Sequence, residues 1–206
     1  MSRYTEKIGR LLPAEKIVGF LKKRTFTDDS GIQLVPLFLD ENGSDGELEE
    51  EIKSFAKWFS DGEVTKYLLP GTPLLLNTDT QKLETVSVPV WLKNISKRKT
   101  AAHWKIMHPQ YGFIGHASLN AIDIKDMSCE RAITIGEKKY WGEGIGKIVG
   151  LMLMKAARES GLKKMTSSPY AENTRSLFNV EAQLGESVGE GVDEEGNKYF
   201  LFSKDL

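Results

Sequence analysis

The chain is poor in the residues that build disulfides and metal sites. Its 206 residues include a single cysteine, Cys129, and three histidines. One cysteine cannot form an internal disulfide, and so few Cys and His residues leave no ligand-rich spacing for a structural zinc ion. We therefore predict no metal site and a reducing, cytoplasmic location.

The chain also lacks long apolar runs and an excess of charge of one sign. No segment approaches the roughly 18 apolar residues that a membrane-spanning helix needs, and charged residues precede any apolar stretch of signal-peptide length. The 28 Lys and Arg residues nearly balance the 29 Asp and Glu residues, for a formal net charge of −1. From these absences we predict that the protein binds neither a membrane nor nucleic acid.

The composition that remains suits a folded domain. Hydrophobic residues make up 40% of the chain and charged residues 28%, which is enough apolar material for one compact core. Residues 1–26 are expected to form an N-terminal helical extension that docks through Ile17, Val18 and Leu21, because these recur at helical spacing. Residues 27–206 are expected to form the domain itself.

Hydrophobic periodicity predicts helices and an antiparallel meander. A helix is expected over residues 47–59, after an acidic loop, and another from near Ser87, after a break at 70–73. The first strand contains Pro36, which favours an edge position because proline has no N–H to donate. The expected strands cover residues 32–39, 100–107, 113–124 and 129–135.

The most informative stretch joins a strand to a long helix through closely spaced glycines. Gly142, Gly144 and Gly146 follow the strand at 129–135 and precede the helix. Glycines let a backbone approach an anion closely, and the N–H groups and dipole at a helix N-terminus favour negative charge. The pattern predicts a diphosphate site.

The glycine spacing disfavours two common phosphate-binding classes. A P-loop needs Ser or Thr after Gly146-Lys147, and Ile148 stands there. In a dinucleotide-binding loop the third glycine would come one residue earlier than Gly150, and the upstream strands would be parallel. A redox enzyme that binds a dinucleotide remains as an alternative class.

Residues 141–146, WGEGIG, resemble the pyrophosphate loop of the GNAT superfamily of acyl-CoA-dependent N-acyltransferases, usually written [Q/R]-x-x-G-x-[G/A]. In this chain Trp141 replaces the Gln or Arg of the first position. The wider stretch IGEKKYWGEGIG is similar to the branch that acetylates ribosomal-protein N-terminal amines, sugar-nucleotide amines and polyamines. SDGEVTKYLL, GHASL and SSPYAENTRSLFNVEAQLG resemble other segments of that branch in the same order. The resemblance covers about residues 32–203.

The resemblance implies an α/β (α+β) fold: a mixed, mainly antiparallel sheet, flanked by helices, with a bulged fourth strand splayed from the fifth. It implies acetyl transfer from acetyl-CoA to a primary amine of a small molecule or a protein N-terminus, by direct attack in a ternary complex. The resemblance is also compatible with a homodimer. A non-catalytic CoA-binding or regulatory module is the alternative. The implied cofactor-binding residues are Ile133, Thr134, Ile135, Trp141, Gly142, Gly144, Ile145, Gly146, Lys147, Asn173 and Ser176.

Glu130 is the candidate general base, because related enzymes carry a carboxylate at the head of the fourth strand that takes the amine's proton. The alternative interpretation is a solvated charge paired with Arg131 or a lysine. The family's acid tyrosine has no counterpart in residues 178–180, Phe-Asn-Val, which leaves Tyr170 as a fallback and water as the proton source.

Four other side chains receive a structural interpretation. His103 and His116 lie on adjacent expected strands, where a histidine is more often structural than basic. No histidine is placed in sequence to activate Cys129, so a covalent acyl-enzyme is discounted. Trp141 can also be a packing residue at the helix start, and this interpretation is compatible with a cofactor contact.

Overall fold

The computed structural model describes residues 14–38, 48–68, 74–77 and 82–206. The acidic loop at 40–47 and the expected break at 70–73 lie outside the described residues. The helices are α1 (Ala14–Leu21), α2 (Glu49–Phe59), α3 (Gly62–Thr65), α4 (Val88–Ser96), α5 (Ile145–Glu159) and α6 (Thr174–Leu184), with a short 3-10 turn at Lys138–Tyr140.

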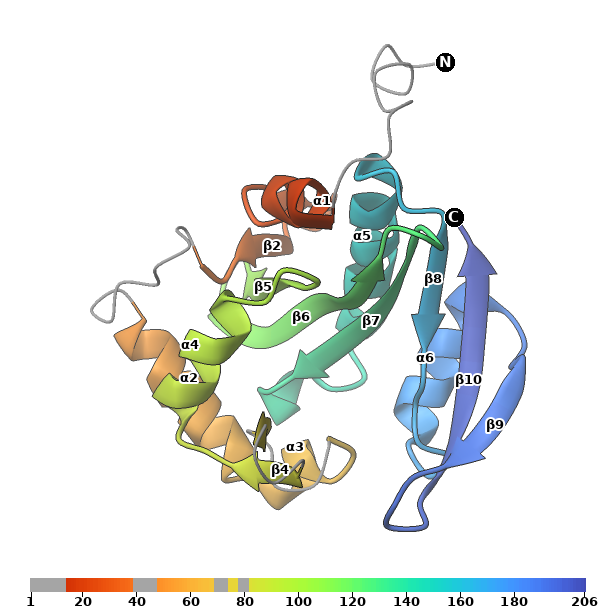
Figure 1. The fold of residues 1–206 in the computed structure, drawn as a ribbon. Coiled ribbons are helices and arrows are strands. Elements are labelled where there is room, and N and C mark those ends of the chain that lie inside the picture. Colours follow the sequence, from red (N-terminus) through yellow and green to blue (C-terminus); the bar gives the residue numbers. More distant parts are fainter. Residues whose placement is uncertain (1–13, 39–47, 69–73, 78–81) are drawn as a thin grey trace.

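An eight-stranded sheet runs through the centre of the molecule in the order β1-β2-β5-β6-β7-β8-β10-β9 (Figure 1). All neighbouring strands are antiparallel except β7 and β8. The predicted mixed, mainly antiparallel sheet is confirmed. Its strands are β1 (Phe26–Thr27), β2 (Gln33–Pro36), β5 (Ala102–His108), β6 (Gly112–Asp123), β7 (Ser128–Ile135), β8 (Lys164–Ser167), β9 (Gly189–Val192) and β10 (Lys198–Asp205).

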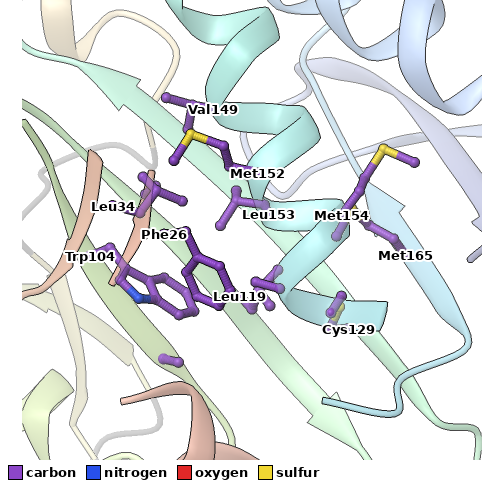
Figure 2. Close-up of a cluster of buried hydrophobic side chains, with 14 of the residues drawn as sticks. Phe26, Leu34, Trp104, Leu119, Cys129, Val149, Met152, Leu153, Met154 and Met165 are labelled. Carbon is purple, nitrogen blue, oxygen red and sulfur yellow. The ribbon is translucent and has the colours of Figure 1, made fainter. Parts of the chain in front are cut away.

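The main hydrophobic core lies between the sheet and helices α1 and α5. Because strand residues alternate in direction, Cys129 and Met165 point from β7 and β8 to the same side as Leu153 of α5 (Figure 2). Trp104 of β5 fills the space near β1 and packs edge-on against Phe26. This core holds α5, and with it the glycine loop, against β7.

A second cluster covers the opposite face of the sheet with α2 and α4 (Figure 1). Phe55 and Trp58 of α2 are fully buried there, and Phe55 contacts Trp91 of α4 and His116 of β6. The helix expected from Ser87 is confirmed, since Ser87 is the N-cap of α4 and Pro89 stands in its first turn.

Helix α1 docks on the main core, as its apolar spacing predicts. Ile17, Val18 and Leu21 are all buried in the same cluster as the sheet residues. Trp104 Nε1 also donates a hydrogen bond to the Arg24 carbonyl, 3.0 Å away, just after the helix. The division of the chain at residue 26 stays a prediction. Within the described segments, no helix is long and apolar enough to cross a membrane.

The edge position predicted for the first strand is only partly correct. The short β1 pairs with Gln33 and Leu34, so β2 is internal at these residues. Val35 and Pro36 pair with β5 but have no partner in β1. The missing N–H of Pro36 therefore falls where the ladder has already ended on one side.

One bulge lies in the strand next to the expected one, and the end of the fourth strand is itself irregular, since the N–H groups of Gly136 and Glu137 both donate to the Ile114 carbonyl. Asn120 pairs with Glu130 and Asp123 pairs with Ser128, so two residues of β6 face the single Cys129 of β7. Ala121 takes a positive φ of 47° there. Sequence patterning also did not predict the two-stranded β3 (Leu74–Asn77) and β4 (Lys82–Thr85).

Candidate functional site

Strands β7 and β8 pair over only three residues and then diverge (Figure 1). The last rung joins Glu130 to Thr166. Beyond it, Ile133, Thr134 and Ile135 pair with β6 alone. The splay implied by the family resemblance is confirmed, and it leaves one edge of β7 able to pair with the amides of a peptide-like ligand.

The glycine loop follows the end of β7 and leads into α5. Gly142 and Gly144 have left-handed φ angles of 89° and 78°, a conformation that costs other residues energy. Gly144 is the N-cap of α5, so the next amides, of Ile145 and Gly146, belong to the first helical turn. These amides have no acceptor within the helix and carry the positive end of its dipole. The arrangement suits a bound anion.

The predicted cofactor contacts around this loop differ in exposure. Ile145 is buried in the main core, so only its backbone is available to a ligand. Lys147 is exposed. Ile133 and Ile135 pack partly against the core, whereas Thr134 points to the other face of the sheet.

Trp141 ties the loop to its surroundings. Its Nε1 donates a 2.7 Å hydrogen bond to the Ile135 carbonyl at the end of β7. The Arg175 guanidinium, from the start of α6, lies 4.2 Å from the centre of the indole ring. The packing interpretation of Trp141 is therefore confirmed. The same contacts place Arg175, which sequence analysis did not single out, beside the glycine loop.

Asn173 and Ser176 form the start of α6. Asn173 is the N-cap, and its side-chain oxygen accepts a 3.1 Å hydrogen bond from the Ser176 N–H. No hydrogen bond among the described residues joins the Asn173 side chain to β7. A cofactor contact at these two residues stays a prediction.

Replacing Asn173 by alanine is expected to weaken CoA binding and to destabilise the protein by about 1 kcal/mol through loss of the cap. Asn173→Asp keeps an oxygen for the Ser176 N–H but removes the amide donor, so it should retain stability and still bind CoA less well. Calorimetric titration with CoA and urea unfolding measure the two effects. Wild-type affinity in both Asn173→Ala and Ser176→Ala would contradict a cofactor contact here.

Glu130 lies at the last rung before the strands diverge, half-buried, opposite Asn120 and Thr166. Its side chain points to the face of the sheet opposite α5, because Cys129 on one side of it points toward the core. The ion pairs among the described residues do not include Glu130. Arg131, offered by sequence as its partner, instead binds Gln183. That part of the structural interpretation is wrong.

His103 and His116 face each other across β5 and β6, with His103 Nδ1 3.2 Å from His116 Nε2. Burial and then the neighbouring His116 lower the pKa of His103, and burial lowers the pKa of His116 to about 4. Both rings are neutral near pH 7 and packed under α2 and α4. The structural interpretation suits both histidines.

Acidification is expected to destabilise the protein through this pair. The pKa of each imidazole is lower in the folded protein than in the unfolded chain, so the unfolded chain binds more protons below about pH 6.5. The free energy of unfolding should therefore fall from pH 7 to pH 5, by at most about 1.4 kcal/mol per pH unit for each imidazole.

Urea unfolding at pH 7 and pH 5 measures this effect, and His116→Gln should flatten the dependence. His108→Gln is the control, because His108 lies at the end of β5, stacked on Tyr111 and outside the pair. Equal pH dependence in wild type and His116→Gln would contradict the assignment.

The two remaining candidates do not suit catalysis. Cys129 is buried, and burial followed by the nearby Glu130 raises the pKa of its thiol to about 12. Tyr170 forms a backbone bridge with Tyr199, and burial and the Asp193 carboxylate raise its pKa to about 12. The Cys129 thiol therefore does not lose its proton near neutral pH, and the Tyr170 phenol is a weaker proton donor than an ordinary tyrosine.

Sequence analysis missed one polar cluster close to the glycine loop. Arg131 of β7 is buried and donates to Gln183 of α6, which in turn bonds Asn179. Strand alternation is the signal that could have found it, because Arg131 shares the core-facing side with Cys129 and Ile133.

Comparison with known proteins bears on this site. A family model described as an acetyltransferase (GNAT) domain matches residues 47–181. No curated protein matches the chain. One similar solved structure is a probable GNAT-family acetyltransferase from Chromobacterium violaceum, which is 14% identical with a TM-score of 0.65. The match covers 88% of this chain and 90% of that one.

Two further structures show the same fold. A domain from Methanocaldococcus jannaschii is 19% identical with a TM-score of 0.63, over 86% of this chain and 100% of that one. A spermidine N-acetyltransferase from Vibrio cholerae, solved with CoA and spermine, is 14% identical with a TM-score of 0.61, over 84% of this chain and 95% of its own.

Proposed function

The chain belongs to the acetyltransferase (GNAT) domain family, and from this premise we propose which of its residues carry out acetyl transfer. The protein is an acyl-CoA-dependent N-acetyltransferase that uses acetyl-CoA to acetylate an amine. Acetyl-CoA supplies an acetyl group activated as a thioester. The observation that carries the assignment of residues is the divergence of β7 and β8 directly before the glycine loop.

Two features fit the two chemical halves of CoA. The left-handed Gly142 and Gly144 and the first-turn amides of α5 suit the diphosphate. The backbone groups of residues 133–135 that the β6 ladder leaves unpaired suit the amides of the pantetheine arm, apart from the Ile135 carbonyl, which already accepts from Trp141. Trp141 keeps these two features together by bonding Ile135.

Glu130 takes the proton of the attacking amine in this proposal. It is a carboxylate at the point of divergence, and the described ion pairs leave it without a cationic partner. The buried Val180 lies in the part of α6 where the family places its tyrosine, so no phenol protonates the departing thiolate. A CoA thiolate is a tolerable leaving group near neutral pH, and water supplies its proton.

The acceptor is a primary amine that approaches from the face of the sheet carrying Glu130, which α2 and α4 partly cover. The structural neighbour from Vibrio cholerae is a spermidine N-acetyltransferase, so spermidine belongs in the first set of amines to be tried. Amines of small molecules and of protein N-termini complete that set.

We also place the protein in the cytoplasm, consistent with its single, buried thiol. We further propose a homodimer, which light scattering would test.

Thermal unfolding with acetyl-CoA, CoA or NADPH tests the cofactor assignment. A ligand held at 100 times its Kd stabilises a protein by roughly 2.7 kcal/mol. We expect acetyl-CoA and CoA to raise the melting temperature and NADPH to leave it unchanged. A shift with NADPH alone would overturn the proposal in favour of a dinucleotide enzyme.

Release of the free thiol, followed across the amine panel, tests turnover. We expect at least one amine to release CoA from acetyl-CoA faster than buffer alone does. CoA binding without thiol release for any amine would instead favour a non-catalytic module.

A further inference from the structure

A buried positive charge lies directly behind the point where β7 and β8 diverge. Arg131 follows the last rung of the ladder and is only 4% exposed. No ion pair among the described residues includes it, and its Nη2 is buried with no hydrogen-bond partner there. Burial lowers the pKa of the guanidinium to about 10, so the charge persists at neutral pH. An unpaired charge inside a protein is costly, and its presence calls for a reason.

The other end of the guanidinium begins a chain of side-chain hydrogen bonds. Arg131 Nη1 donates to Gln183 Oε1. Gln183 Nε2 donates to the Lys147 carbonyl at 3.2 Å and to Asn179 Oδ1 at 2.6 Å. Asn179 Nδ2 then donates to the Gly146 carbonyl at 3.3 Å. The chain thus runs from β7 through α6 to the first turn of α5.

Helix α5 packs closely against the side chains of this cluster. A Cβ at Gly150, one turn further along α5, would overlap both the Gln183 amide and the Arg131 guanidinium. Only glycine at this position lets α5 lie this close to the two side chains. The carbonyls that the cluster grips belong to Gly146 and Lys147, whose peptide groups are part of the turn that begins at Gly144.

We propose that Arg131, Gln183 and Asn179 are positioning residues that hold the first turn of α5 in place for the diphosphate of CoA. This inference rests on the proposed function, because it assumes that the glycine loop binds that diphosphate. Arg131 anchors the amide of Gln183, and Gln183 and Asn179 anchor the loop carbonyls. The unpaired charge of Arg131 adds a positive field on the side of the sheet where α5 begins, and CoA brings negative charge to it.

Gln183→Glu separates anchoring from mere space filling. The substituted carboxylate has the same shape and still accepts from Arg131, but it has no donor for the Lys147 carbonyl and repels Asn179 Oδ1. Arg131→Met removes the charge and the anchor together. We expect each variant to raise the Kd for CoA at least about 10-fold, the equivalent of roughly 1.4 kcal/mol.

A truncated acetyl donor distinguishes the proposed positioning role from a general loss of structure. S-acetyl-pantetheine has the thioester and the amide arm but no diphosphate, so both variants should use it at the wild-type rate. Ser160→Ala is the matched control, because Ser160 is a buried polar residue just after the far end of α5 and its hydroxyl donates to the Ala157 carbonyl. It should bind CoA as the wild type does.

Three outcomes overturn the inference. One is unchanged CoA affinity in folded Gln183→Glu, which decides the matter even if Arg131→Met fails to fold. Another is a rate with S-acetyl-pantetheine that falls in proportion to CoA affinity, which would point to a general loss of structure. The third is equal weakening in Ser160→Ala. Failure of the wild-type protein itself to bind CoA would instead refute the proposed function, so the two failures are distinguishable.

Discussion

Gly146→Val is expected to weaken CoA binding by at least about 100-fold while the protein stays folded. A Cβ at this position would meet Asn179 Nδ2 at 3.4 Å, an ordinary contact, and the backbone of Gly146 has no positive φ. The fold therefore tolerates a side chain there. The added methyl groups of valine are expected to obstruct a phosphate that approaches the backbone of the first turn.

Two glycine variants make this test specific. Gly62→Val is the matched control, because Gly62 also lies in the first turn of a helix, with nothing within 4 Å of an added Cβ. Gly144→Ala should lower the free energy of unfolding by about 1–2 kcal/mol, since its φ of 78° strains any side chain. Calorimetry with CoA and thermal unfolding separate affinity from stability. Wild-type CoA affinity in a folded Gly146→Val protein would rule out this binding mode.

Glu130→Gln is expected to slow acetyl transfer by about 10²- to 10⁴-fold and to leave CoA affinity nearly unchanged. The substitution keeps the shape of the side chain and removes its basicity. CoA binding should survive because the proposed contacts are mainly backbone groups of β7 and of the glycine loop and do not include the carboxylate. A loss confined to the rate would identify Glu130 as the group that takes the amine's proton.

The measurement is a pH–rate profile from pH 6 to pH 9, with the amine that the thiol-release panel identifies, alongside CoA titrations. Glu159→Gln is the matched control, because Glu159 is an exposed carboxylate at the opposite end of α5 from the glycine loop. If Glu130→Gln keeps the wild-type rate across this range, Glu130 is only a strand-end charge and the amine loses its proton to solvent.

Sequence alone predicted the features that depend on neighbours along the chain. Alternation of apolar residues predicted the meander that became β5, β6 and β7, and Ser87 with Pro89 predicted the start of α4. The glycine spacing predicted a turn into a long helix, and Gly142 and Gly144 adopt the left-handed angles that only glycine takes easily. Each of these rests on backbone preferences within a few residues.

Tertiary structure decided the features that depend on distant partners. Strands β7 and β8 are joined by only three residue pairs before they diverge, and β10, from near the C-terminus, takes the other side of β8. The short β1 made only half of β2 internal, and a bulge fell in β6. Periodicity shows which face a residue takes but not which strand lies beside it.

The same limit applies to the site. The glycine loop was found from the spacing of its residues, and Asn173 and Glu130 were found from the family resemblance of the segments that hold them. Strand alternation could place Arg131 on the core-facing side of β7, but no local signal joins it to Gln183, which is 52 residues away in sequence. Their contact exists only because α5 and α6 pack on the same side of β7, where a buried guanidinium must find its hydrogen-bond acceptor on another element. Local chemistry along the chain thus determined where an anion can bind, and packing between distant elements determined what holds that place in position.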